Sequence, residues 1–160
     1  MTVHLWRIAA DTPDYTADEL SGKGAELTGG RWNRKGKSVV YAAAHVSLAV
    51  LETIAHRNAG SLPLNRYLVR IDVPDDIWKK ARRLTVETAA VGWDAIPAGK
   101  VSLDYGEQWL DNPAKPALLR VPSAIVPEEE NVLIDPRHAD SRKITATKLR
   151  KWTYDGRVWT

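Results

Sequence analysis

The N-terminal residues alternate between apolar and polar side chains, which is the pattern of a β-strand with one face against a core. The alternation runs over residues 3–8 and returns over residues 66–72. Three short apolar runs separated by prolines follow at 117–121, 124–126 and 131–134. The chain therefore predicts several short strands broken by turns.

Two turns that contain glycine predict β-hairpins. Residues 31–33 and 38–41 flank a loop with Gly36, so we expect Asn33 to pair with Ser38 and Arg31 with Val40. Near the C-terminus, strands over 143–149 and 152–159 are expected to end in a hairpin at Asp155-Gly156.

Residues 46–55 are mostly apolar, which predicts a helix buried on most sides. Shorter helices are expected at 75–80, after Pro74, and at 104–110, closed by Asn112-Pro113. Strands outnumber helices and do not alternate with them regularly. We therefore expect an α+β fold, a single domain over 1–160 with short, mainly antiparallel strands and a few helices.

Composition excludes several classes of protein. The 160 residues are 44% hydrophobic and 27% charged, an ordinary globular balance, and no apolar run reaches the roughly 18 residues of a membrane span. Without cysteine there is no disulfide, thiolate zinc site or cysteine nucleophile. The N-terminus lacks a basic patch followed by an apolar core, so we expect no signal peptide and a cytoplasmic location.

Charge and aromatic content leave one alternative open. The net charge of +3 permits an anionic ligand without demanding one. The chain has 7 Trp and no Phe, and we expect most of these tryptophans in the core. Basic residues interleave with Trp152, Tyr154 and Trp159, which is a nucleic-acid footprint in principle but is more typical of a half-buried sheet.

Glu52 is the first residue that asks for a chemical explanation. On an ideal helix Leu48, Leu51 and Ala55 lie within about 100 degrees to one side of it. A carboxylate at the edge of such an apolar stripe must be paired or partly solvated in a cleft. The structural alternative is an ion pair, for which Arg57 is a candidate partner.

Arg31 and Tyr41 are the next candidates. Arg31 follows Gly29-Gly30, and a guanidinium beside a closely approaching backbone can hold a phosphate with two hydrogen bonds. The expected hairpin brings Tyr41 within one residue of Arg31 and leads into the helix of Glu52, so the three side chains can meet at one cleft. The alternatives are a solvated arginine and a core tyrosine. No metal-ligand spacing is present, so no metal site is expected.

The combination of these residues resembles the RES domain family, which is named for an arginine, a glutamate and a serine. The matching positions are Arg31, Glu52 and Ser123, and the similarity extends over nearly the whole chain. The segments that carry it are Gly30-Arg31-Trp32-Asn33, Gly36, Val39-Val40-Tyr41-Ala42, Ser47 to Glu52, His56, Gly106, Trp109-Leu110, Val121-Pro122-Ser123-Ala124, Glu129, Asn131 to Ile134 and Pro136-Arg137-His138. One departure is Asp135, where the family often has Asn.

The resemblance implies a toxin of a toxin–antitoxin pair, neutralised by an Xre-type helix-turn-helix antitoxin. It implies a fold similar to ADP-ribosyltransferases and a reaction that consumes NAD+ as substrate, by hydrolysis, phosphorolysis or transfer of ADP-ribose to a protein. Cleavage of NAD+ by water or phosphate is the first expectation, and transfer to a protein is the alternative. A nucleic-acid-acting toxin that uses the basic C-terminal segment is a further alternative.

The same resemblance implies a role for each matching residue. Glu52 would stabilise positive charge at the ribose, and Arg31 would hold the pyrophosphate. Tyr41 would pack against the nicotinamide ring or its ribose. Ser123 would either hydrogen-bond the nicotinamide amide or orient Glu52. Neither a metal nor a resident cofactor is implied.

Overall fold

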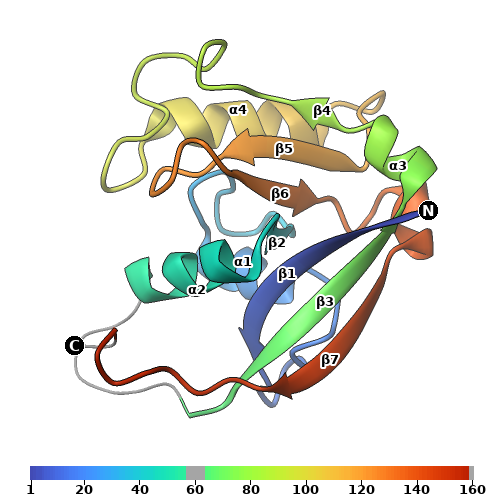
Figure 1. Ribbon diagram of the computed structural model, residues 1–160. Helices are drawn as coiled ribbons and strands as arrows, with labels where there is room; N and C mark the ends of the chain where they lie inside the picture. Colours follow the sequence, from blue (N-terminus) through green and yellow to red (C-terminus); the bar gives the residue numbers. More distant parts are fainter. Residues whose placement is uncertain (57–63, 159–160) are drawn as a thin grey trace.

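A single sheet of seven strands organises the protein in the computed structural model, which describes residues 1–56 and 64–158 (Figure 1). The strand order is β4-β5-β6-β2-β1-β3-β7, and among the paired neighbours only β4 and β5 are parallel. This arrangement confirms an α+β fold with mainly antiparallel strands. The strands are β1 (Thr2–Ala10), β2 (Val40–Ala43), β3 (Arg66–Pro74), β4 (Arg82–Arg83), β5 (Leu118–Pro122), β6 (Glu130–Ile134) and β7 (Thr145–Lys151).

The helices lie on and around this sheet. They are α1 (Lys23–Thr28), α2 (Val46–Ala55), α3 (Asp75–Lys79), α4 (Lys100–Asp111) and the 3-10 helix η1 (Ala139–Lys143). In Figure 1, α2 lies beside β1 and β2, and α4 runs along β4 and β5 at the other end of the sheet. None of the helices in the described ranges is both long and apolar enough to cross a bilayer.

The alternating residues of β1 and β3 form the longest strand pair, from Thr2↔Pro74 to Ala10↔Arg66. Their inward side chains, among them Leu5 and Ile71, are buried in the largest core cluster. The short β2 is hydrogen-bonded to β1 on one edge and β6 on the other. Strands predicted from alternation are therefore confirmed, with longer bounds than expected.

Helix α2 has the predicted bounds, but the expectation that it is buried on most sides is wrong. Only Leu48 and Ala49 are buried, where they pack against the sheet with Ile8 and Leu68. Leu51 is 40% exposed. The helix covers the sheet with one face, and beyond it the C-terminal segment with Trp152 and Tyr154 packs against only part of α2.

The predicted hairpin between 31–33 and 38–41 does not form. Both edges of β2 are already occupied by β1 and β6, so no edge is left for residues 31–33. These residues instead make a tight turn with a bridge between Gly30 and Asn33. The buried Asn33 amide donates to the main-chain oxygens of Ala25, Arg34 and Lys37, which holds the turn in place.

Two further strand predictions are wrong for local reasons. Residues 124–126 form a turn because the Ser123 hydroxyl accepts hydrogen bonds from the main-chain N–H groups of Ile125 and Val126, each at 3.1 Å. After Trp152 the chain leaves the sheet, and Tyr154 is buried against α2. Residues 152–158 contain no strand, and Trp159 lies outside the described residues.

Three tryptophans, Trp32, Trp93 and Trp109, are buried in a second core cluster between α4 and β5–β6. Of the others that the structure describes, Trp6, Trp78 and Trp152 are half-buried. Gly106 of α4 allows the helix to approach this cluster, since a Cβ there would lie 1.8 Å from the main-chain oxygen of Trp32. The contact fixes the backbone next to Arg31.

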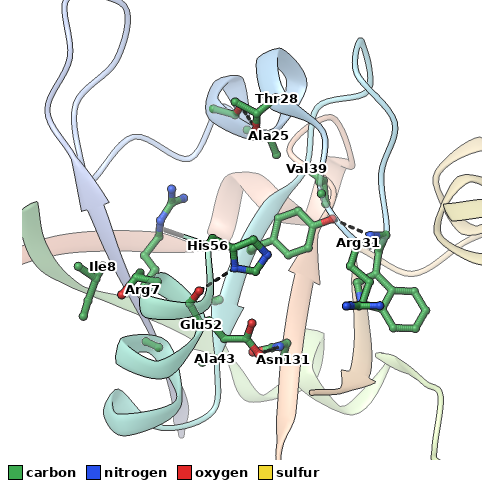
Figure 2. Close-up of a pocket in the computed structure, with 18 of the residues that line it drawn as sticks. Arg7, Ile8, Ala25, Thr28, Arg31, Val39, Ala43, Glu52, His56 and Asn131 are labelled. Carbon is green, nitrogen blue, oxygen red and sulfur yellow. Dashed lines mark hydrogen bonds between the residues drawn. The ribbon is translucent and has the colours of Figure 1, made fainter. Parts of the chain in front are cut away.

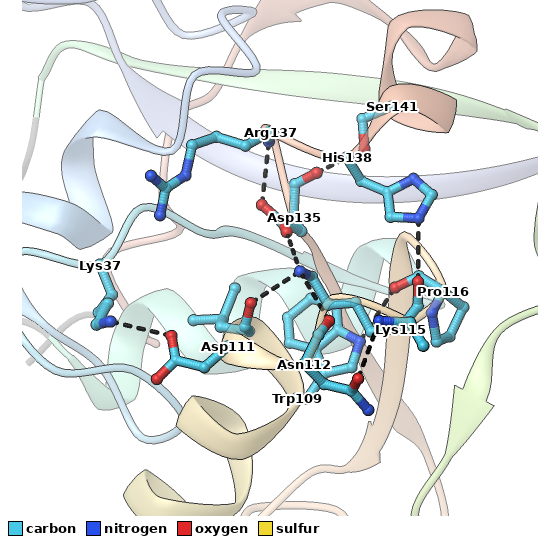
Figure 3. Close-up of polar contacts among 12 residues, drawn as sticks. Lys37, Trp109, Asp111, Asn112, Lys115, Pro116, Asp135, Arg137, His138 and Ser141 are labelled. Carbon is cyan, nitrogen blue, oxygen red and sulfur yellow. Dashed lines mark hydrogen bonds and ion pairs between the residues drawn. The ribbon is translucent and has the colours of Figure 1, made fainter.

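A buried ion pair joins the loop after α4 to the end of β6 (Figure 3). Lys115 Nζ lies 2.9 Å from Asp135 Oδ2, and these side chains are only 11% and 6% exposed. Lys115 also donates to the main-chain oxygen of Leu110, and Asp135 accepts from the N–H of Arg137. The acid that departs from the family pattern thus has a lysine partner in this chain.

Candidate active site

A cavity of about 380 Å³ opens between β1, β2, α2 and the segment that contains α1 (Figure 2). Its volume falls in the range of about 300–1,000 Å³ that is typical of small-molecule sites. Arg31, Tyr41 and Glu52 all line it, so three of the four predicted site residues share one cavity. Ser123 does not line it.

Glu52 extends from α2 towards β6, and its carboxylate is held on one oxygen. Oε1 accepts hydrogen bonds from Ser123 Oγ at 2.8 Å and from Asn131 Nδ2 at 2.7 Å. Within the described ranges, Oε2 has no protein hydrogen-bond donor and Glu52 forms no ion pair. The alternative partner Arg57 lies outside the described residues. Among the contacts of the described residues, one carboxylate oxygen is therefore fixed and the other has no protein partner.

Ser123 lies behind Glu52 and is fully buried. Its hydroxyl donates to Glu52 and accepts from the N–H groups of Ile125 and Val126. With one hydrogen bond donated and two accepted, the hydroxyl has no further hydrogen-bonding capacity. The geometry therefore fits the alternative in which Ser123 orients Glu52 and does not fit a contact with the nicotinamide amide.

The Tyr41 hydroxyl is engaged by the turn at residues 30–33. It accepts from the N–H of Trp32 at 3.0 Å and donates to Asn33 Oδ1 at 2.7 Å. Burial raises the pKa of Tyr41 well above its ordinary value, so the hydroxyl stays protonated. A Cβ on Gly30 would lie 2.8 Å from this hydroxyl oxygen, which explains the glycine. The aromatic ring of Tyr41 is the part left for a ligand.

Arg31 is brought to the cavity by this same turn, although the strand pairing that predicted its position is absent. Its Nη1 donates to the main-chain oxygens of Trp93 at 3.1 Å and Ala95 at 2.8 Å. Trp93 stacks on Trp32 with ring centroids 6.3 Å apart, which holds the loop against the guanidinium. Arg31 forms no ion pair with any acid in the described segments, so its charge is free for an anion.

Arg7 is a site residue that sequence reasoning missed. It extends from β1 into the cavity (Figure 2), where burial lowers its pKa and the nearby Tyr15 opposes that effect. No hydrogen bond or ion pair to its guanidinium is found among the described residues. A guanidinium remains protonated in proteins, and burial without a counter-ion is costly. The sequence offered only an arginine at a polar position of an alternating strand.

Asn131 and His56 also line the cavity. Both belong to segments that resemble the RES family, but no role was assigned to either from the sequence. Arg7, Lys23 and Arg31 contribute positive charge to the lining, and Glu19 and Glu52 contribute negative charge. Within the residues described, no group of three or more His, Asp or Glu side chains could hold a metal ion. The arrangement suits a ligand that carries both phosphates and a cationic ring.

The RES domain matches residues 4–155. A protein of Sphingobium sp. (strain YBL2), named Prs ADP-ribosylating toxin, is 55% identical over 99% of this chain and 98% of its own length. Proteins named Toxin Res are 39% identical in Yersinia enterocolitica (78% of this chain, 79% of theirs) and 35% identical in Pseudomonas putida (97% and 99%).

Proposed function

Because the chain belongs to the RES domain family of toxins, we propose that it binds NAD+ in this cavity, releases nicotinamide and transfers ADP-ribose to a protein. The observation that carries the proposal is the Glu52 carboxylate, held on Oε1 by two donors in a cavity lined by cationic side chains. The name of the Sphingobium relative supports transfer to a protein over the cleavage by water or phosphate that the sequence first suggested.

Breakage of the bond between nicotinamide and ribose passes through a centre with oxocarbenium character, as glycoside cleavage does. Nicotinamide is cationic in NAD+ and leaves as a neutral molecule, so no strong general acid is required. A fixed carboxylate can stabilise the developing positive charge and accept a hydrogen bond from a ribose hydroxyl. Glu52 fits this role because Ser123 and Asn131 restrain Oε1, while Oε2 has no donor among the residues that the structure describes.

The arginines suit the pyrophosphate. One guanidinium group can donate two parallel hydrogen bonds to phosphate oxygens. Such charged hydrogen bonds are among the strongest that proteins make. Arg7 lacks an anionic partner among the described residues, and Arg31 uses Nη1 for two main-chain oxygens. The ring of Tyr41 is available to pack against nicotinamide or its ribose.

We expect Arg7→Gln to raise the KM for NAD+ at least tenfold, because a charged hydrogen bond is worth about 1.5–3 kcal/mol. Arg31→Lys should also weaken binding, since lysine cannot satisfy two main-chain oxygens and grip two phosphate oxygens. Steady-state kinetics on NAD+ measures both changes. The exposed Arg142 provides the control, and Arg142→Gln should leave KM unchanged. An unchanged KM in both cavity variants would place the pyrophosphate elsewhere.

The group that accepts ADP-ribose can be a protein, water or phosphate. The relative's name points to Prs, and we propose that Prs is the acceptor here as well. Water or phosphate is the second candidate, supported by the family resemblance. Chromatography of NAD+ incubated with the protein alone, with phosphate or with purified Prs separates the cases. We expect nicotinamide release to depend on Prs, with ADP-ribose attached to it by intact mass. Equal release of free ADP-ribose without Prs would instead favour hydrolysis.

We further propose that an Xre-type antitoxin neutralises this chain by covering the mouth of the cavity. The family resemblance supports the partner, and the mixed charge of the lining offers contacts for either sign of side chain. Occlusion predicts that the complex neither consumes nor binds NAD+. Calorimetric titration of NAD+ into the purified complex tests this, and binding at the affinity of the free chain would refute it.

The nucleic-acid alternative has less support. The predicted C-terminal hairpin is absent over residues 152–158, and Tyr154 is buried against α2 instead of being displayed on a surface strand. Strong, salt-dependent binding of RNA or DNA would revive this alternative.

A further inference from the structure

His56 lies one turn beyond Glu52, at the C-terminal end of α2, and lines the cavity (Figure 2). Its Nδ1 is 2.7 Å from the main-chain oxygen of Glu52. A carbonyl oxygen can only accept a hydrogen bond, so Nδ1 must carry the proton in this contact. In the neutral ring, the lone pair is therefore on Nε2, which has no hydrogen-bond partner in the described part of the chain.

This contact fixes both the tautomer and the orientation of the ring, as a general base requires. In the view of Figure 2 the imidazole lies beyond the end of α2, with Arg7 on one side of it and Arg31 on the other. By contrast, Asn131 and Ser123 next to Glu52 act as hydrogen-bond donors to its carboxylate. Among the described residues that line the cavity, His56 is the one histidine.

We propose that His56 is the general base that deprotonates the acceptor of ADP-ribose, a residue role that rests on the function proposed above. The bond between C1′ of the ribose and the ring nitrogen of nicotinamide breaks, and its electron pair stays on nicotinamide. The acceptor's hydroxyl or amine forms the new bond to C1′, and its proton passes to Nε2. The positive charge of NAD+ thus ends on the imidazolium, which returns the proton to water.

The proposal implies a pH dependence with a defined sign. The base acts only when neutral, so transfer should fall as the pH is lowered and the imidazole gains a proton. Nearby carboxylates favour the imidazolium and nearby cations oppose it. The charged and titratable groups that line the same cavity are Arg7 of β1, Tyr15, Glu19, Lys23 of α1, Arg31, Tyr41 of β2 and Glu52 of α2.

The test separates catalysis from helix capping. His56→Asn keeps a side-chain N–H near the position of Nδ1, so it can still donate to the Glu52 oxygen, but it has no second ring nitrogen. We expect kcat for ADP-ribose transfer to fall about 10²-fold, as loss of a general base typically costs, with KM for NAD+ changed less than about threefold. The acidic limb of the pH profile should disappear. His45→Asn, at the other end of the same helix, is the matched control and should keep both rate and profile.

A second variant guards against a structural effect. His56→Ala should lose activity similarly and regain part of it when imidazole is added to the solution, which a capping role does not predict. Transfer by His56→Asn at the wild-type rate with an unchanged pH profile would overturn the role of His56 alone. A reduced rate whose pH profile keeps its acidic limb would also overturn it. A wild-type chain that releases no nicotinamide with any acceptor would overturn both this role and the proposed function.

Discussion

Glu52→Gln is expected to reduce nicotinamide release about 10²–10³-fold while the protein stays folded. Glutamine keeps the length of the side chain, and its amide oxygen can still accept from Ser123 and Asn131. What is lost is the negative charge at Oε2, and removal of one preorganised group at a developing charge typically costs this much in rate. The measurement is turnover of NAD+ beside a melting curve.

Glu19 offers a matched control, because its carboxylate also lines the cavity but is bound by Ser21 at 2.7 Å. Glu19→Gln should keep turnover within about fivefold, well below the loss for a transition-state group. Near-normal turnover by folded Glu52→Gln would remove Glu52 from the mechanism. Unfolding of the Glu52 variant would favour the structural ion pair considered from the sequence.

Asp135→Ala is expected to lower the free energy of unfolding by about 3–5 kcal/mol, because it leaves the buried Lys115 ammonium without its counter-ion. Figure 3 shows the two side chains within one network that joins the end of β6 to the loop after α4. Denaturant titration measures the loss. The double variant Asp135→Asn with Lys115→Met should recover much of it, since no buried charge then remains.

A surface pair in the same figure serves as the control. Lys37 Nζ lies 3.0 Å from Asp111 Oδ1, with side chains 35% and 56% exposed. Asp111→Ala should cost no more than about 1 kcal/mol, the usual value of an exposed ion pair. If Asp135→Ala cost equally little, the buried pair would not be a structural requirement of this fold.

Local sequence patterns predicted the strands and the helix that can be recognised from their own residues alone. Alternation located β1 and β3, and the high apolar content of residues 46–55 located α2 with its bounds. The prediction of a hairpin at 31–41 was wrong because a glycine indicates a turn but not which strands pair on either side of it. The pairing of β2 with β1 and β6 depends on the whole sheet. The burial of α2 was overestimated because apolar content does not reveal how many layers surround a helix.

The sequence likewise predicted some residues of the candidate site and missed others. Periodicity marked Glu52, the glycines and the expected hairpin marked Arg31 and Tyr41, and the family pattern added Ser123. The contacts that orient Glu52 come from residues 71 and 79 positions away, a separation that no local pattern spans. Arg7 was missed since a strand arginine that faces a cavity and one that faces solvent look alike in sequence.

Because Glu52→Gln is expected to turn over slowly, this variant allows binding of NAD+ to the cavity to be measured with little consumption of the ligand. Calorimetric titration of NAD+ into Glu52→Gln should give a single saturable site per chain. Binding should weaken at least tenfold when Arg7→Gln is added, because the pyrophosphate loses a charged partner. Absence of binding to the folded Glu52→Gln protein, or binding that is indifferent to Arg7, would contradict the account.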